Sequence, residues 1–268
     1  MSKFAALFVS FVLVGSVGCV APLGAGGELE VVLVSEVEWG ALNPARGAAG
    51  PRAGTLWGDR AGAGASGFLV EFLEGFESPP HIHNVSYRGV VVEGLVHNDD
   101  PGAQAMWMPA GSYWTQPRGG VHITSASGAR NVAYIEIEDG PYLVQPVEEA
   151  FDSGEAPVNV DAGNLVWLDL AGGARVAHLW GRPRAGEWSG ALLELGDGFE
   201  GTLRTAGASL RVVVIGGRLE LADGGAVLPA GSSVGSSGEG GQAIEVAADG
   251  ASLVYVRVLG ELEVVGGR

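Results

Sequence analysis

Residues 75–94 read GFESPPHIHNVSYRGVVVEG. His81 and His83 stand one residue apart, next to an apolar, β-branched run of the kind that forms strands. Side chains alternate between the two faces of a strand, so both imidazoles are expected to point the same way. Such a strand can offer two nitrogen ligands to one metal ion, with Tyr87 further along on the same face.

A second stretch, residues 111–122, supplies a third histidine. It reads GSYWTQPRGGVH and brings His122 after a proline and glycine turn. Three histidines from two separate segments can form a facial three-nitrogen site that leaves coordination positions open. Neutral imidazoles suit zinc, iron, manganese, nickel or copper, so the ligands alone do not select the metal.

The first stretch resembles the first cupin motif, which consists of a glycine, a His-x-His pair, an acid and a second glycine at fixed spacing. The matching residues are Gly75, His81, His83 and Gly94. Tyr87 stands where the family has glutamate, so the site lacks one carboxylate charge.

The second stretch resembles the second cupin motif. The matching residues are Gly111, Pro117, Gly119 and His122, while Ala126 replaces the family's asparagine. Together the two resemblances imply an all-β jelly-roll barrel, also called a double-stranded β-helix, with one divalent metal ion held by the three histidines.

Three short segments further resemble an uncharacterised bacterial family of two-cupin proteins that has no assigned reaction. They are LWGDR at 56–60, PPHIHN at 79–84 and MPAGS at 108–112. Among cupins, a three-histidine site resembles those of the diketone-cleaving and thiol dioxygenases, which implies an iron enzyme. The second motif is also similar to the zinc cupin of anti-sigma factors, which implies a sensor or ligand-binding module.

An internal repeat divides the chain in two. The segment LWG at 56–58 recurs at 179–181, an offset of 123, and PAGS at 109–112 recurs at 229–232, an offset of 120. Two copies in one order predict two tandem cupin barrels. The 46 glycines and many valines of the chain suit short strands joined by tight turns, as in an all-β fold.

These patterns predict four segments. We expect a signal peptide with a lipobox cysteine at 1–19, an N-terminal metal-binding cupin at 28–146, a proline-containing acidic linker at 147–162 and a degenerate C-terminal cupin at 163–268.

The second copy lacks the ligands of the first. The offset places Arg204, Ala206, Leu210 and Gln242 at the positions of His81, His83, Tyr87 and His122. The glycine and apolar frame survives without imidazoles, so the fold itself does not require the histidines. We interpret the second barrel as a metal-free partner that serves as a dimerisation or lid element, and a homodimer is one option.

Residues 4–18 form an uncharged, mostly apolar run that ends at Cys19, the only cysteine of the chain. Such a run is typical of a signal peptide, and Val17-Gly18-Cys19 resembles a bacterial lipobox. Ser16 departs from the aliphatic residue usual at its place. We expect an exported cell-envelope lipoprotein, anchored to the membrane only through Cys19; the alternative is a plain signal peptide with a chance cysteine.

The net charge of −16 argues against nucleic-acid binding, because an acidic surface repels phosphates. Its simplest meaning is solubility.

Other side chains border the two motifs. Tyr87 is expected to hydrogen-bond a metal-bound water; ligation as phenolate and a capping role are alternatives. Thr124 shares the strand face of His122. Trp107, Trp114 and Gln116 can line an aromatic pocket, although core packing is the commoner role of tryptophan.

The run HNDD at 97–100 precedes proline and glycine, so we interpret it as a turn with polar caps.

The sequence therefore predicts a metal-binding bicupin that binds a small-molecule ligand, with His81, His83 and His122 on one ion of iron, zinc or manganese and Tyr87 as a catalytic group. The leading hypothesis is a metalloenzyme that acts on a small oxygen-rich molecule by oxygenation, hydrolysis or isomerisation. The alternative is a non-catalytic ligand-binding or sensing lipoprotein.

Overall fold

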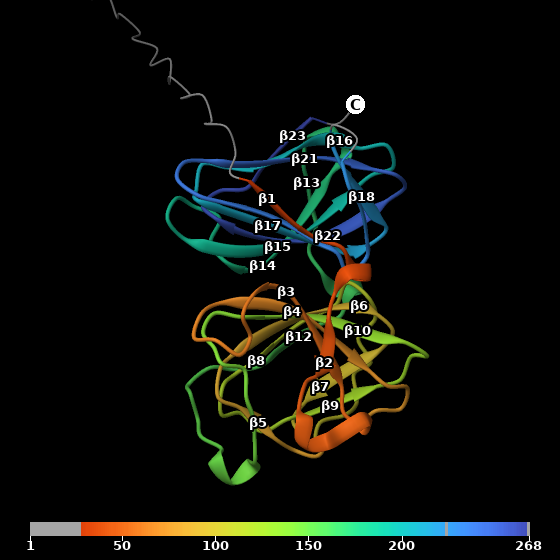
Figure 1. Cartoon of the computed structure of the whole chain (residues 1–268), viewed down its shortest axis with the longest axis vertical. Coiled ribbons are helices and arrows are strands. Elements are labelled where there is room, and N and C mark those ends of the chain that lie inside the picture. Colours follow the sequence, from red (N-terminus) through yellow and green to blue (C-terminus); the bar gives the residue numbers. More distant parts are fainter. Residues whose placement is uncertain (1–27, 223–224, 267–268) are drawn as a thin grey trace, which may run out of the picture.

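The computed structural model describes residues 28–222 and 225–266, so the predicted signal peptide and Cys19 lie outside the described residues. Strands and short 3₁₀ turns form two barrels, stacked along the long axis of the molecule (Figure 1). The expected all-β fold of two tandem jelly-roll barrels is confirmed. Within the described residues, no helix has the length and apolar character needed to cross a membrane.

Each barrel contains one seven-stranded antiparallel sheet. In the first barrel its order is β12 (Val158–Val160), β8 (Tyr113–Gln116), β6 (Tyr87–Glu93), β10 (Asn131–Ile137), β4 (Ser66–Phe72), β3 (Arg52–Gly58) and β2 (Trp39–Ala41). In the second barrel it is β1 (Leu29–Val32), β20 (Ser233–Ser237), β17 (Ser209–Gly216), β22 (Ser252–Leu259), β15 (Trp188–Leu195), β14 (Arg175–Gly181) and β13 (Leu168–Asp169).

Smaller sheets complete the barrels. The first barrel has the pairs β7 (Val96–Asp99) with β9 (Ile123–Ala126) and β5 (Ile82–His83) with β11 (Val144–Gln145). The second has a five-stranded sheet of β19 (Val227–Pro229), β18 (Arg218–Leu221), β21 (Gln242–Ala248), β16 (Glu200–Thr205) and β23 (Glu263–Gly266). The 3₁₀ turns are η1 (Val34–Glu36), η2 (Pro44–Ala49), η3 (Val147–Glu149), η4 (Ala162–Asn164) and η5 (Ala171–Gly173).

The two barrels exchange edge strands. Strand β1 pairs with β20 of the second barrel, and β12 pairs with β8 of the first. The sequence predicts β1 in the first barrel and β12 in the linker at 147–162. In the structure β1 joins a sheet of the second barrel and β12 a sheet of the first. The physical reason is that β8 and β20 each present an open edge, which the incoming strand covers with main-chain hydrogen bonds.

The seven-stranded sheets pack against each other and form the interface between the barrels. Along β6, Val90 and Val92 belong to the apolar cluster between the sheets, whereas Val91 belongs to the core of the first barrel. This follows from the alternation of side chains along a strand. A strand between two cores is covered on both faces. The neighbouring strand β10, which pairs with β6, lies in the same position, and all of its residues are buried.

A buried ion pair crosses this interface. Glu136 on β10 and Arg257 on β22 are 0% and 3% exposed, and the guanidinium Nη1 donates to Glu136 Oε1 at 2.7 Å. The hydroxyls of Tyr134 and Tyr255 donate to Glu136 Oε2 at 3.0 and 3.1 Å. Arg257 also pairs with Glu138 at 2.7 Å, so both charges are compensated.

The repeat explains how the interface is built. In the first barrel the indole of Trp57 lies over Gly67 and donates to the hydroxyl of Tyr134 at 3.0 Å. A Cβ at Gly67 would lie 2.1 Å from the Trp57 Nε1, so only glycine fits there. The second barrel repeats this arrangement with Trp180, Gly190 and Tyr255. The recurring Leu-Trp-Gly segments therefore mark the contact surface between the barrels.

Replacing Arg257 by methionine is expected to lower the free energy of unfolding by about 3–5 kcal/mol, because it leaves the carboxylate of Glu136 buried without its main partner. Urea unfolding of the purified protein measures the change. The control is Arg130→Met, which removes an exposed pair with Glu71 and Glu93 and is expected to cost at most about 1 kcal/mol. Equal losses in the two variants would contradict the assigned role of the buried pair.

Candidate metal centre

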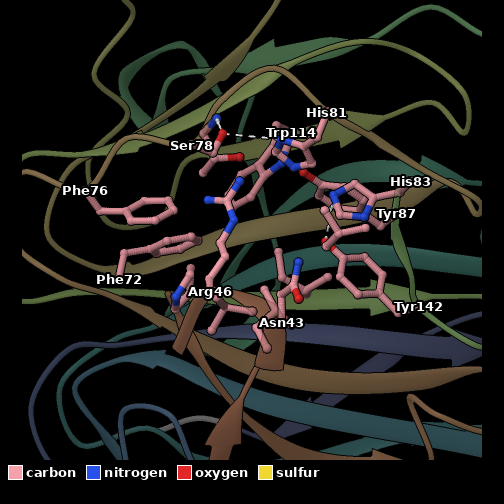
Figure 2. Close-up of a pocket in the computed structure, with 16 residues that line it drawn as sticks. Asn43, Arg46, Phe72, Phe76, Ser78, His81, His83, Tyr87, Trp114 and Tyr142 are labelled. Carbon is pink, nitrogen blue, oxygen red and sulfur yellow. Dashed lines mark hydrogen bonds between the residues drawn. The ribbon is translucent and has the colours of Figure 1, made fainter. Parts of the chain in front are cut away.

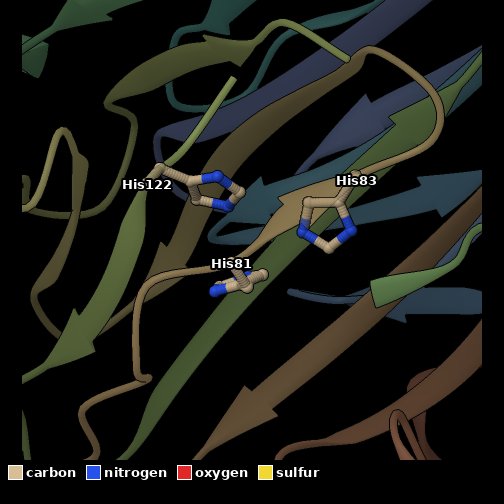
Figure 3. A group of neighbouring side chains, drawn as sticks. All are labelled: His81, His83 and His122. Atoms are coloured by element: carbon tan, nitrogen blue, oxygen red, sulfur yellow. The ribbon is translucent and has the colours of Figure 1, made fainter. Parts of the chain in front are cut away.

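The three histidines of the two motifs converge inside the first barrel. His81 and His122 are antiparallel partners, with main-chain hydrogen bonds of 3.1 and 3.0 Å between them, and His83 lies on β5. All three are buried, and their candidate ligand nitrogens lie within 4.8 Å of one another. The rings face a common centre (Figure 3). Small ring rotations bring these nitrogens within reach of one ion, for which metal–nitrogen distances of about 2.0–2.1 Å are usual.

Main-chain carbonyls fix the orientation and tautomer of each ring. The Nδ1 atoms lie 2.9 Å from the oxygen of Pro79 in His81, 2.9 Å from that of Leu143 in His83 and 3.1 Å from that of Gly120 in His122. A carbonyl oxygen only accepts hydrogen bonds, so each Nδ1 carries the proton. Each Nε2 therefore keeps its lone pair, which is the arrangement that metal-binding histidines show.

The Nε2 of His122 has no hydrogen-bond partner within the described part of the chain, although it is fully buried. An unsatisfied buried acceptor costs free energy unless something binds it. A metal ion held by the three Nε2 atoms would satisfy it, so these residues fit a divalent ion.

The surroundings keep the imidazoles uncharged. Burial lowers the pKa of His122 to about 3, and the nearby His81 acts in the same direction. Burial also lowers the pKa of His83 well below its usual value, and the nearby His122 and His81 lower it further. For His81 burial is again the largest cause, and the positive charge of Arg46 lowers the pKa further. At neutral pH the three lone pairs are thus free of competing protons.

Tyr87 lies beside the histidines but directs its hydroxyl elsewhere. Its ring stands edge-on to that of His83, with the ring centres 5.1 Å apart. The hydroxyl donates to Asn98 Oδ1 at 2.9 Å, and burial raises the pKa of the phenol. Tyr87 is therefore a neutral hydrogen-bond donor in the pocket wall, and its catalytic role stays a prediction.

Asn98 is the centre of a buried network that the sequence does not indicate. Its Oδ1 also accepts from Thr124 Oγ1 at 2.8 Å, and its Nδ2 donates to Gln116 Oε1 at 3.1 Å. Gln116 in turn donates to the carbonyl oxygen of Gly120, which holds the ring of His122. The network thus connects Tyr87 to the turn that carries a candidate ligand.

The interpretation of residues 97–100 as a turn is wrong for the first three of them. Val96–Asp99 forms β7 and pairs with β9. The polar side chain of Asn98 suggested a turn, but it is buried in the network, and Asp100 begins the actual turn.

A second phenol, missed by the sequence analysis, contacts a candidate ligand directly. The hydroxyl of Tyr142 lies 3.1 Å from His83 Nε2, and the two rings are stacked with centres 4.4 Å apart. Because this Nε2 carries no proton, the hydroxyl is the donor. The sequence signal was weak: Tyr142 is an aromatic residue in the segment after β10, outside both motifs.

His81 and His83 line a cavity of about 40 Å³, enough for about three water molecules. Of the predicted lining residues, Trp114 and Thr124 contribute to it, whereas Trp107 lies at the surface, 41% exposed. The described lining is Leu42, Asn43, Arg46, Pro51, Val70, Phe72, Phe76, Ser78, His81, His83, Tyr87, Trp114, Thr124, Ile135, Tyr142 and Val144. Ten of these residues are labelled in Figure 2.

The motif glycines set the turns that position the ligands. Gly94, Gly111 and Gly119 have φ angles of 84°, 84° and 74°, a region that residues with a Cβ rarely adopt. A Cβ at Gly119 would also lie 2.6 Å from the carbonyl oxygen of Phe151. Glycine is thus required just before His122, where the sequence shows it.

Residues 30–265 match a family described as a domain of unknown function, DUF4437. The chain belongs to this family. No curated protein matches its sequence. The DUF4437 match covers both barrels of this chain.

Several solved structures resemble this member of the DUF4437 family in fold. A "putative dioxygenase" from Nostoc punctiforme is 16% identical with a TM-score of 0.67, and the match covers 90% of this chain and 88% of that one. Bacillus subtilis oxalate decarboxylase, whose structure is described with Mn(II) centres, is 11% identical with a TM-score of 0.56, covering 89% and 78%. Hazelnut (Corylus avellana) vicilin is 9% identical with a TM-score of 0.56, covering 88% and 87%. At these identities the likenesses show the fold alone, which is that of cupins.

The second barrel of this DUF4437 protein has an apolar interior where the first has the histidines. Leu210, the counterpart of Tyr87, is fully buried in its core together with Leu203. Arg204 pairs with Glu263 instead of facing a metal pocket. Within the described residues, the three histidines of the first barrel are the only such cluster of candidate metal ligands.

Protein purified without chelator is expected to contain about one divalent metal ion per chain, because one cluster fits an ion. Replacing His122 by alanine is expected to abolish this content, as measured by elemental analysis. The matched control is His178→Ala, which removes an exposed histidine of the second barrel and leaves the content unchanged. A reproducible value near two, or equal content in both variants, would contradict the assignment.

Proposed function

We propose that this protein is a metalloenzyme of the cell envelope. Its first barrel would hold one divalent metal ion on His81, His83 and His122 and act on a small oxygen-rich molecule. The reaction class is oxygenation, or metal-assisted hydrolysis or isomerisation. The observation that carries the proposal is the cluster of three buried histidines, each with a main-chain carbonyl on Nδ1 that leaves Nε2 available for ligation.

The pocket residues support such chemistry in distinct ways. A divalent ion on three neutral imidazoles would supply Lewis acidity and open coordination positions. The carbonyl clamps hold the rings in place, and apolar walls such as Phe72 and Ile135 limit the entry of water. Of the two phenols, Tyr142 is better placed than Tyr87 to donate a hydrogen bond to a bound ligand. An ion on His83 Nε2 would displace the hydrogen bond that the Tyr142 hydroxyl donates to that nitrogen, whereas the Tyr87 hydroxyl would still donate to Asn98.

The metal is proposed to be iron, zinc or manganese. All three accept neutral imidazole ligands, and the absence of a carboxylate ligand does not separate them. The Mn(II) centres of Bacillus subtilis oxalate decarboxylase support manganese as a candidate.

A second candidate function is a non-catalytic ligand-binding or sensing module. The observation in its favour is the Tyr142 hydroxyl, which lies 3.1 Å from His83 Nε2 and is near enough to act as a fourth ligand. Structural zinc sites are closed by four protein ligands, whereas catalytic sites keep a position open. The resemblance of the second motif to the zinc cupin of anti-sigma factors agrees with this alternative.

Azide distinguishes the metalloenzyme from the sensing module, because it binds a metal ion only at a coordination position that no protein ligand occupies. Titrating azide into the cobalt-loaded full-length protein is expected to change the visible absorption spectrum and to saturate. The variant Tyr142→Phe is expected to respond in the same way. A silent wild-type protein beside a responsive Tyr142→Phe variant would favour the closed site and the sensing function.

We also propose that the protein is exported and anchored to a membrane through lipid on Cys19. The support is the uncharged run at 4–18 that ends at the only cysteine of the chain. Two or more acyl chains would hold the protein at the membrane surface without a spanning helix.

The variant Cys19→Ser is expected to move the protein from the membrane fraction to the soluble fraction of its native host, as followed by immunoblotting. The control is Ser16→Leu, which restores the aliphatic residue usual in a lipobox and keeps the membrane association. Membrane association of Cys19→Ser would overturn the anchor.

A further inference from the structure

Arg46 introduces a positive charge into the pocket lined by His81 and His83. It lies on η2, in the connection between β2 and β3, and its side chain extends into the cavity towards Ser78 and His81 (Figure 2). Within the described residues no carboxylate pairs with its guanidinium, whereas Arg52, Arg88 and Arg130 of the same barrel each pair with glutamate.

The charges of this pocket do not balance. No aspartate or glutamate is among its described lining residues, and Tyr87, a neutral phenol, stands where the cupin motif has an acid. A divalent ion on three uncharged imidazoles would add two positive charges to that of Arg46. The chain as a whole carries a net charge of −16, so this pocket has the opposite sign to the protein around it. Uncompensated positive charge in a partly desolvated cavity favours an anionic ligand.

We propose that the pocket binds a small organic carboxylate, whose carboxylate group is recognised by the guanidinium of Arg46 while the metal centre holds the other end or the same group. This inference rests on the proposed metal centre and names the substrate class for it. Arg46 is then the residue that determines specificity for acids over neutral molecules of the same shape.

Two further features favour a small organic acid. A guanidinium presents parallel N–H donors that match a planar carboxylate, and such charge-assisted pairs are strong and directional. The cavity of about 40 Å³ admits only a short molecule, and Val70, Phe72 and Phe76 offer apolar contacts to a carbon skeleton. A tetrahedral inorganic anion would use the guanidinium but would gain nothing from these apolar walls.

The test is calorimetric titration of the cobalt-loaded full-length protein with acetate, acetamide and inorganic phosphate. Acetamide has the shape of acetate without the charge. The wild-type protein is expected to bind acetate more tightly than either of the other two. Arg46→Gln is expected to weaken acetate binding roughly 10- to 100-fold, because it removes a charge-assisted hydrogen-bonding group. Arg46→Lys keeps the positive charge but lacks the parallel N–H donors of the guanidinium. Its acetate affinity is expected to lie between those of the wild type and Arg46→Gln.

The matched control is Arg182→Gln, which makes the same charge change at an exposed position of the second barrel and is expected to leave the acetate affinity unchanged. Metal content and thermal unfolding of each variant verify that the centre is intact. Equal acetate affinity of wild type and Arg46→Gln, with metal bound in both, would overturn the role of Arg46 and leave the metal centre standing. Phosphate binding as tight as acetate binding would overturn the carboxylate assignment. Wild-type protein without metal would overturn the proposed function itself and this inference with it.

Discussion

Strand β10 has no solvent-exposed face, and most of the architecture follows from that. One face packs into the first barrel through Ile135, and the other meets the second barrel through Tyr134 and Glu136. Taking Glu136 out of water is tolerable only because Arg257 and two tyrosine hydroxyls satisfy it. Contact between the two barrels is therefore required to satisfy Glu136. The exchanged edge strands β1 and β12 also hold the barrels together.

The candidate site is connected to this interface through strand β6. Strand β6 runs beside β10 and carries Tyr87 on the pocket face and Arg88 on the interface face, where its guanidinium pairs with Glu138 and stacks on Trp180. The wall of the pocket is thus the back of the inter-barrel contact. The loops that carry the histidines are held separately, by main-chain hydrogen bonds between His81 and His122 and by carbonyls on each Nδ1.

The second barrel shows what the fold needs and what it does not. The tryptophan, glycine and tyrosine of the interface recur in both repeats, because each indole requires a glycine beneath it and a hydroxyl beside it. The imidazoles do not recur, and apolar side chains such as Leu210 occupy the interior instead. At the centre of the interface the repeat places a glutamate, Glu136, opposite an arginine, Arg257. Equal positions with opposite charges make the two halves complementary where identical residues would repel.

The sequence by itself determined the two barrels and the convergence of the three histidines, because strand alternation and glycine turns act over a few residues and leave a readable spacing. It could not place Tyr142 against His83, which lies 59 residues away in the chain. Nor could it bring Arg46 into the pocket or exchange the edge strands. These contacts join segments that share no local period, so only the packing of the sheets decides them. The tertiary structure thus decided the charge and the second phenol of the pocket, since both depend on which loops meet above the barrel.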